Sequence, residues 1–141
     1  MDKNCSEICR YRMGISFEDY AVAEDNVGKG FSRAAINRAY YSIFHMMNAL
    51  LFLDCLEFKA HTAVIAKFRE KYIKTGIFER NLSDIIRDLF EYRNNSDYAD
   101  LFVISLEEAK LQVENAKFFI ETVKAYIEKR LSENNYSEKG E

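Results

Sequence analysis

One short polar segment of this sequence contains the residue types that are needed to handle a phosphate group. It begins with Arg93 and Asn94 and ends with Asp97 and Tyr98. A guanidinium group is a planar, permanently positive fork that suits phosphate, and an amide side chain both donates and accepts hydrogen bonds. Asp97 could orient Arg93, and Tyr98 offers a hydroxyl group. The alternative is structural, with an Arg–Asp pair joining the end of one helix to the following loop.

The two histidines lie outside this segment. His45 falls in an apolar helical stretch, so we expect it to pack in the core with one nitrogen hydrogen-bonded. His61 stands at the predicted start of a helix, where it either serves as a capping or surface residue or lines a site. Two histidines cannot complete a three-ligand zinc site without carboxylates or thiols. We therefore expect no metal and no cofactor.

The three cysteines predict no catalytic thiol and no metal site. Cys5 and Cys9 have the spacing of one helix face, and we expect two small buried or half-buried residues there. Cys55 has no evident histidine and acid partner in the sequence. An odd number of cysteines at low density indicates a reducing, cytoplasmic setting.

The elements that must position these side chains are predicted to be helices. Apolar residues repeat with helical period along almost the whole chain, which has no proline and only 5 glycines among its 141 residues. We expect an all-α fold, an up-and-down antiparallel bundle of about five helices, at residues 5–25, 31–55, 61–74, 81–92 and 106 to about 131. The pattern predicts one domain over residues 1–131, a loop at 93–97, and a polar, disordered tail at 132–141.

Charge and hydropathy exclude some classes of partner. The chain has 20 basic and 23 acidic residues, a net charge of −3, which is unlike a general polyanion binder but compatible with a local basic patch. No apolar run reaches about 18 residues, so we expect no transmembrane span. The polar start of the chain has no apolar core of a signal peptide. These observations predict a cytoplasmic protein with no membrane partner.

Aromatic side chains are abundant, with 9 tyrosines and 11 phenylalanines. The stretch at 50–53 is apolar on every side of its predicted helix, which suggests burial on several sides. A homodimer interface could bury a surplus of apolar surface. The alternative is a well-filled core within one chain.

Three segments, in this order, carry a resemblance to a known family. They are AINRAYYSIF at 35–44, KAHTAVIAKF at 59–68 and RNNSDY at 93–98. Together they resemble small, stand-alone HEPN-domain proteins of bacteria and archaea, over about residues 5–130. The resemblance implies a HEPN-like bundle of four to five helices that usually pairs as a homodimer.

The resemblance also implies a site. Many HEPN proteins are metal-independent RNases, in which an arginine, the polar residue after it and a histidine a few residues further on act together. Arg93 and Asn94 match the first two positions. The histidine would fall near positions 97–99, where Asp97 and Tyr98 complete the candidate catalytic set instead. His61 and Arg38 are candidate site-lining residues, and whether this chain is an enzyme stays open.

A related branch of the family implies a partner and a modification. Small HEPN proteins are often encoded beside a minimal nucleotidyltransferase, as toxin and antitoxin, and the transferase can place AMP on a tyrosine of the equivalent loop. Tyr98 is the candidate here by position. The resemblance thus implies a toxin-like RNase, or a degenerate derivative of one, under the control of a nucleotidyltransferase. The alternatives are a non-catalytic module that binds a nucleotide or a protein, and a plain structural bundle.

Overall fold

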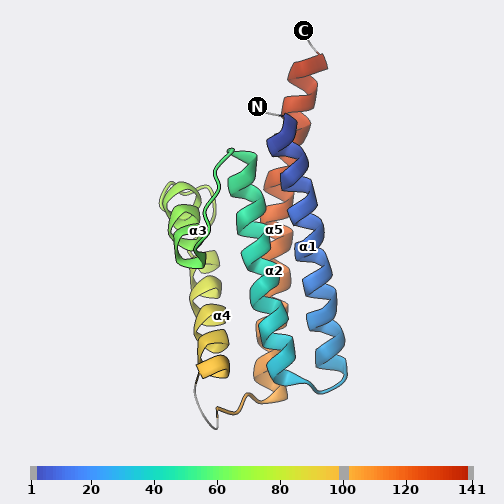
Figure 1. Cartoon of the computed structure of the whole chain (residues 1–141), viewed down its shortest axis with the longest axis vertical. Helices are drawn as coiled ribbons and strands as arrows, with labels where there is room; N and C mark the ends of the chain where they lie inside the picture. The colour runs from blue at the N-terminus through green and yellow to red at the C-terminus, as the bar shows by residue number, and fades with distance from the viewer. Residues whose placement is uncertain (1–2, 99–101, 140–141) are drawn as a thin grey trace.

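The computed structural model describes residues 3–98 and 102–139, and the side chains of residues 4–96 and 102–133. Every regular element within these residues is helical (Figure 1). The elements are α1 (Lys3–Gly28), α2 (Ser32–Leu53), α3 (His61–Phe68), the π-helical turn η1 (Arg69–Ile73), α4 (Asn81–Tyr98) and α5 (Leu106–Lys139). The predicted all-α fold class is confirmed.

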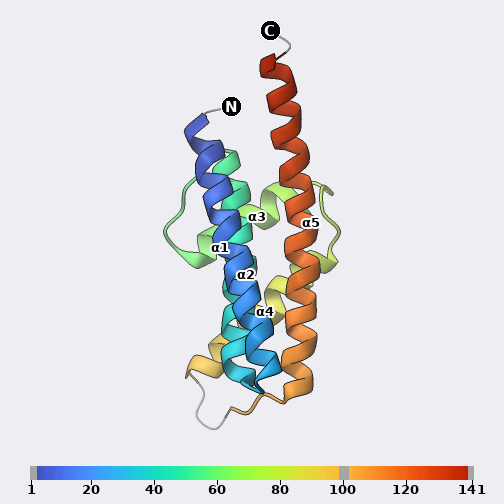
Figure 2. The ribbon, with the colours of Figure 1, turned by 90° about the vertical axis from the view of Figure 1, so that its right-hand side faces the viewer.

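The helices form an up-and-down bundle with α2 at its centre. The three long helices α1, α2 and α5 lie side by side, and α3 and α4 follow one another along the other side of α2 (Figure 1). Figure 2 shows that α1 begins and α5 ends at the same end of the bundle. None of the helices in the described ranges is long and apolar enough to cross a membrane.

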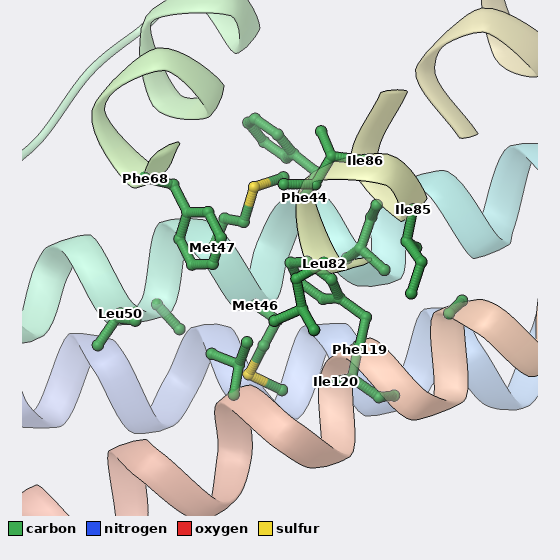
Figure 3. Packing of buried hydrophobic residues seen from close by; sticks show 14 of the residues in the cluster. Phe44, Met46, Met47, Leu50, Phe68, Leu82, Ile85, Ile86, Phe119 and Ile120 are labelled. Atoms are coloured by element: carbon green, nitrogen blue, oxygen red, sulfur yellow. The ribbon is translucent and has the colours of Figure 1, made fainter. Parts of the chain in front are cut away.

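The core is built around α2, which is buried for most of its length. In Figure 3, Met46 of α2 points toward α5 and Met47 toward α3, whereas Leu50 lies between α2 and α1; all three are buried. Residues 50–53 are also buried within the single chain, so this stretch fills the core of one protomer, as in the alternative stated above. Each such side chain contributes about 1.5–3 kcal/mol on burial.

The fourth helix is longer than the sequence predicts. We expected it to end near Tyr92 and a loop to cover residues 93–97, but α4 continues to Tyr98. The expected loop is wrong, because Leu89, Arg93 and Ser96 continue one face of the helix at i, i+4 and i+7. Leu89 and Ser96 are buried and Arg93 is half-buried, so packing outweighs the turn preference of the Asn-Asn-Ser-Asp run.

The third and fifth helices also differ from prediction at their ends. The helix expected over 61–74 is an α-helix only as far as Phe68, and η1 completes it. Gly76 then adopts a φ of 81°, the left-handed conformation that commonly ends a helix. The expectation that the last helix ends near residue 131 is wrong, since α5 runs to Lys139; its sequence contains no glycine or proline, and the next glycine is Gly140.

Two of the cysteines are paired. Cys5 at the start of α1 forms a disulfide with Cys55, which follows α2, across a Cα–Cα distance of 5.4 Å. Cys5 is half-buried and Cys9 is buried, as we expected, but the sequence did not predict that Cys5 is paired. Periodicity could not reveal this pair, because the two residues are 50 positions apart and meet only when α1 packs along α2. Cys9 is buried and free.

Candidate functional site

Arg93 lies on α4 and packs against two tyrosines of α2. Its guanidinium carbon lies 5.0 Å from the centre of the Tyr40 ring and 5.3 Å from that of the Tyr41 ring. One of its Nη atoms donates a hydrogen bond to the Tyr41 hydroxyl at 3.1 Å. Aromatic faces attract a cation at such distances, so the two rings fix the plane of the guanidinium group.

His61, the first residue of α3, contacts the same two tyrosines. Its Nδ1 lies 3.0 Å from the Tyr40 hydroxyl oxygen, and its ring meets the Tyr41 ring edge-on at 5.8 Å. The imidazole also stacks on Phe44, with ring centres 3.9 Å apart. The packing of α3 and α4 against α2 therefore brings His61 and Arg93 to the same pair of tyrosines. We call this pair the Tyr40–Tyr41 wall.

The surroundings of Tyr40 and His61 favour the uncharged form of each side chain. Burial raises the pKa of Tyr40 to about 12, although Arg93 acts in the opposite direction. Burial lowers the pKa of His61 below its usual value, and the positive charge of Arg93 lowers it further. A histidine near pH 7 with a lowered pKa is an uncharged imidazole that can accept a proton.

Arg38 adds a second guanidinium group to the wall. Its guanidinium carbon lies 5.1 Å from the centre of the Tyr41 ring, and it forms an ion pair with Asp19 of α1 at 3.1 Å. The other oxygen of Asp19 lies 3.7 Å from Nε2 of His45. Burial lowers the pKa of His45, while Asp19 acts to raise it.

A surface hollow of about 740 Å³ adjoins this cluster. It lies where α1 ends and α2 begins, and Phe31, Arg33, Asn37 and Arg38 contribute to its lining. Arg38 thus borders both the hollow and the Tyr40–Tyr41 wall. Two arginines on a partly apolar surface fit a ligand that carries both a phosphate and a flat ring.

The residues predicted from sequence have different outcomes. The structure brings Arg93, His61 and Arg38 together around Tyr41. Asn94 is half-buried on α4. As the next residue of the helix, it projects about 100° around the helix axis from Arg93. The side chains of Asp97 and Tyr98 lie outside the described residues, so their place in the site stays a prediction.

Sequence reasoning missed the tyrosines of the wall. We assigned the aromatic stripes to the core, and Tyr40 is indeed fully buried, but its hydroxyl group faces His61. The adjacent pair of tyrosines in the segment 35–44 was the available signal, since a core position rarely requires a hydroxyl group. In the part of the chain that the structure describes, no group of three His, Cys, Asp or Glu side chains is arranged to hold a metal ion.

Comparison with known proteins identifies relatives over most of the chain. A family model described as "HEPN domain" matches residues 10–129. The UPF0332 protein of Thermotoga maritima is 35% identical over 77 residues, which cover 55% of this chain and 58% of that protein. Two Methanocaldococcus jannaschii proteins are named "Putative toxin MJ0142" and "Putative toxin MJ0605". The first is 32% identical over 89 residues (63% of this chain, 60% of that protein), and the second is 31% identical over 98 residues (70% and 73%). The matched part thus spans about three fifths of the first two relatives.

Proposed function

Since the chain belongs to the HEPN domain family, we propose that it is a toxin-like protein that cleaves RNA without a metal ion. The names of the Methanocaldococcus jannaschii relatives support the toxin-like role. In this proposal the protein acts as a homodimer in the cytoplasm, and a nucleotidyltransferase antitoxin controls it.

One observation carries the proposal. The guanidinium group of Arg93 is held by Tyr40 and Tyr41, and a neutral histidine contacts the same two rings. A fixed positive fork stabilises the charge that develops on a phosphate during cleavage, and a histidine transfers protons near pH 7. Both functions are needed to break RNA without a metal.

The predicted site residues take the following roles in this proposal. Arg93 binds the phosphate group being cleaved, and Asn94 hydrogen-bonds to the RNA beside it. Asp97 orients Arg93, and Tyr98 donates a hydrogen bond to the substrate. Arg38 lines the path of the RNA toward the adjoining hollow.

The proposed control acts through Tyr98. A nucleotidyltransferase would place AMP on its hydroxyl group, which adds a negative phosphate and a base next to a positively charged site. The phosphate would pair with Arg93 and exclude RNA. Intact-mass measurement of the protein co-expressed with a minimal nucleotidyltransferase tests this step. We expect a mass increase of one AMP group that Tyr98→Phe abolishes, and an unchanged mass contradicts it.

RNA cleavage by the purified protein in EDTA tests the proposed activity. We expect the wild-type protein to cleave RNA and Arg93→Ala to be inactive. Arg87→Ala is the matched control, because Arg87 is an exposed arginine of the same helix that pairs with Asp84 and Asp88. No cleavage by unmodified wild-type protein contradicts the proposed activity.

A non-catalytic module is the second candidate function. The observation in its favour is that the expected histidine is absent from positions 97–99. The arginines and the Tyr40–Tyr41 wall would then bind a nucleotide or a partner protein without turnover. Calorimetry with AMP and with the nucleotidyltransferase tests it, and the expected result is binding that Arg93→Ala weakens, with no cleavage.

A further inference from the structure

His61 has the position and the free nitrogen that the candidate site needs for proton transfer. Nδ1 faces the Tyr40 hydroxyl group at 3.0 Å, and Phe44 covers one face of the ring. Nε2, on the other side of the ring, has no hydrogen bond within the described part of the chain. The side chain is half-buried, so it remains reachable from solvent.

We propose that His61, from outside the Arg93–Tyr98 segment, is the general base of the RNA cleavage reaction and that the Tyr40 hydroxyl group positions it. This inference rests on the proposed function. It assigns the proton-accepting role of the histidine that is absent from positions 97–99, and it places the base on a different helix from the arginine.

The proposed step is a transesterification within the RNA. Nε2 of His61 accepts the proton of a ribose 2′-hydroxyl group, and the 2′-oxygen forms a bond to the neighbouring phosphorus. The bond from phosphorus to the 5′-oxygen breaks, its electron pair stays on that oxygen, and the oxygen takes a proton from water. His61 then returns its proton to water. The products are a 2′,3′-cyclic phosphate and a 5′-hydroxyl end, with no change of oxidation state.

In the proposed arrangement the Tyr40 hydroxyl group orients the imidazole through Nδ1. When Nδ1–H donates to the Tyr40 oxygen, Nε2 is left without a proton and is the acceptor. Tyr40 is fully buried on α2, so its hydroxyl group cannot move away from the imidazole without disturbing the core. A hydrogen bond that holds the ring in this orientation makes Tyr40 a positioning residue rather than a catalytic one.

His45 provides the internal comparison. It is the second of the two histidines in the chain, and burial lowers its pKa as well. However, its Nε2 faces the carboxylate of Asp19 at 3.7 Å, and its Nδ1 is buried without a hydrogen-bond partner within the described residues. Neither nitrogen is placed to take a proton from a ligand bound at Arg93.

Kinetics of RNA cleavage by single variants test the assignment. We expect His61→Gln to lower the cleavage rate about 10²–10⁴-fold, the usual contribution of a general base. RNA binding and the melting temperature should stay near their wild-type values. His45→Gln should cleave at the wild-type rate, and Tyr40→Phe should lose less activity than His61→Gln. Added imidazole should restore part of the activity of His61→Ala.

The dependence of the rate on pH gives a readout that a structural role would not change. The groups that face His61 are Tyr40, Tyr41 and His45 from α2 and Arg93 from α4. We expect the wild-type rate to rise with pH, with a midpoint below the usual histidine value of about 6.5. The midpoint should equal the pKa that NMR measures for His61. Arg93→Ala should raise that NMR pKa, because a nearby positive charge is removed.

The outcomes separate the inference from the proposed function. Cleavage by His61→Gln at the wild-type rate overturns the role of His61 and leaves the proposed RNase activity intact. No cleavage by unmodified wild-type protein overturns both. If His61→Gln fails to fold, a wild-type kinetic midpoint that differs from the NMR pKa of His61 still overturns the inference.

Discussion

Two arginines of this protein contact tyrosines at different levels along α2, and their other partners differ. Arg130 donates to the Tyr72 hydroxyl group and to the Asp54 carboxylate, both at 2.8 Å. Arg93 packs on the rings of Tyr40 and Tyr41 and donates to a phenol hydroxyl group. Fourteen residues separate Tyr40 from Asp54, about 20 Å at the rise of a helix.

The charged groups of the Arg130 cluster pair with one another. Asp54 accepts from Tyr72 and Arg130 and pairs with Lys71 at 3.1 Å. Burial acts to raise the pKa of Asp54, but the hydrogen bonds from these three partners outweigh it and hold the pKa below its usual value. The cluster joins α5, η1 and the end of α2 next to the Cys5–Cys55 disulfide, so its role is to hold the bundle together.

The Arg93 cluster differs in the kind of partner. Tyr40 and Tyr41 orient the Arg93 guanidinium group, and burial together with Arg93 lowers the pKa of the neighbouring His61. The same arginine–tyrosine contact therefore occurs in two settings in one bundle. Beside the Asp54 carboxylate it stabilises the fold, and beside His61 it is where we propose that a phosphate binds.

The largest expected effect separates the two arginines by activity. Arg93→Ala should lower RNA cleavage about 10²–10³-fold, the usual loss when one donor to a developing negative charge is removed. Arg130→Ala should cleave at the wild-type rate when both are assayed well below their melting temperatures. Equal losses in the two variants would contradict the difference between the clusters.

Reduction of the disulfide comes next. The bond closes a loop between residues 50 positions apart, and we expect its reduction to lower the free energy of unfolding by about 2–4 kcal/mol. Urea unfolding with and without a reducing agent measures this, and Cys5→Ser should no longer respond to the reducing agent. Cys9→Ser is the control that keeps the bond, since Cys9 is buried and burial raises its pKa to about 11. Equal stability of reduced and oxidised wild type would be evidence against the pairing.

Removal of the carboxylate tests the Arg130 cluster directly. Asp54→Asn should lower the free energy of unfolding by about 2 kcal/mol, because hydrogen bonds to a charged group are lost and Arg130 and Lys71 lose their carboxylate partner. Asp25→Asn is the matched control, since Asp25 forms an exposed i,i+4 pair with Lys29 that contributes only about 0.3–0.5 kcal/mol. A similar small effect for both substitutions would contradict a stabilising role of the Arg130 cluster.

The smallest expected effect is on the acid side of the stability profile. Because the pKa of Asp54 is lower in the folded state, its contribution is complete above its unfolded pKa of about 3.9 and is lost as the pH falls further. Wild type should therefore lose more of its free energy of unfolding than Asp54→Asn does between pH 5 and pH 2. Parallel pH profiles of the two proteins, measured by urea unfolding, would contradict this linkage.

Local pattern predicted the helices but not all of their ends. The apolar repeat placed α2 and α5 correctly at their starts, within one or two residues. It failed at the end of α4, where Asn94, Asn95 and Ser96 have turn preferences that are weaker than the packing of Arg93 on the tyrosines. It failed again at Cys5 and Cys55, whose pairing depends on how α1 and α2 align.

The candidate site divides in the same way. The sequence alone determined that Arg93 is unusual, because a polar run follows a strongly periodic apolar helix, and that the chain forms an all-α bundle. Only the tertiary structure decided that His61, which is 32 positions away in sequence, meets Arg93 at the Tyr40–Tyr41 wall. The physical reason is that helix formation depends on neighbours within a few residues, whereas a site between helices depends on which faces pack together. That choice is made by the whole core around α2 and leaves no local signal at either residue.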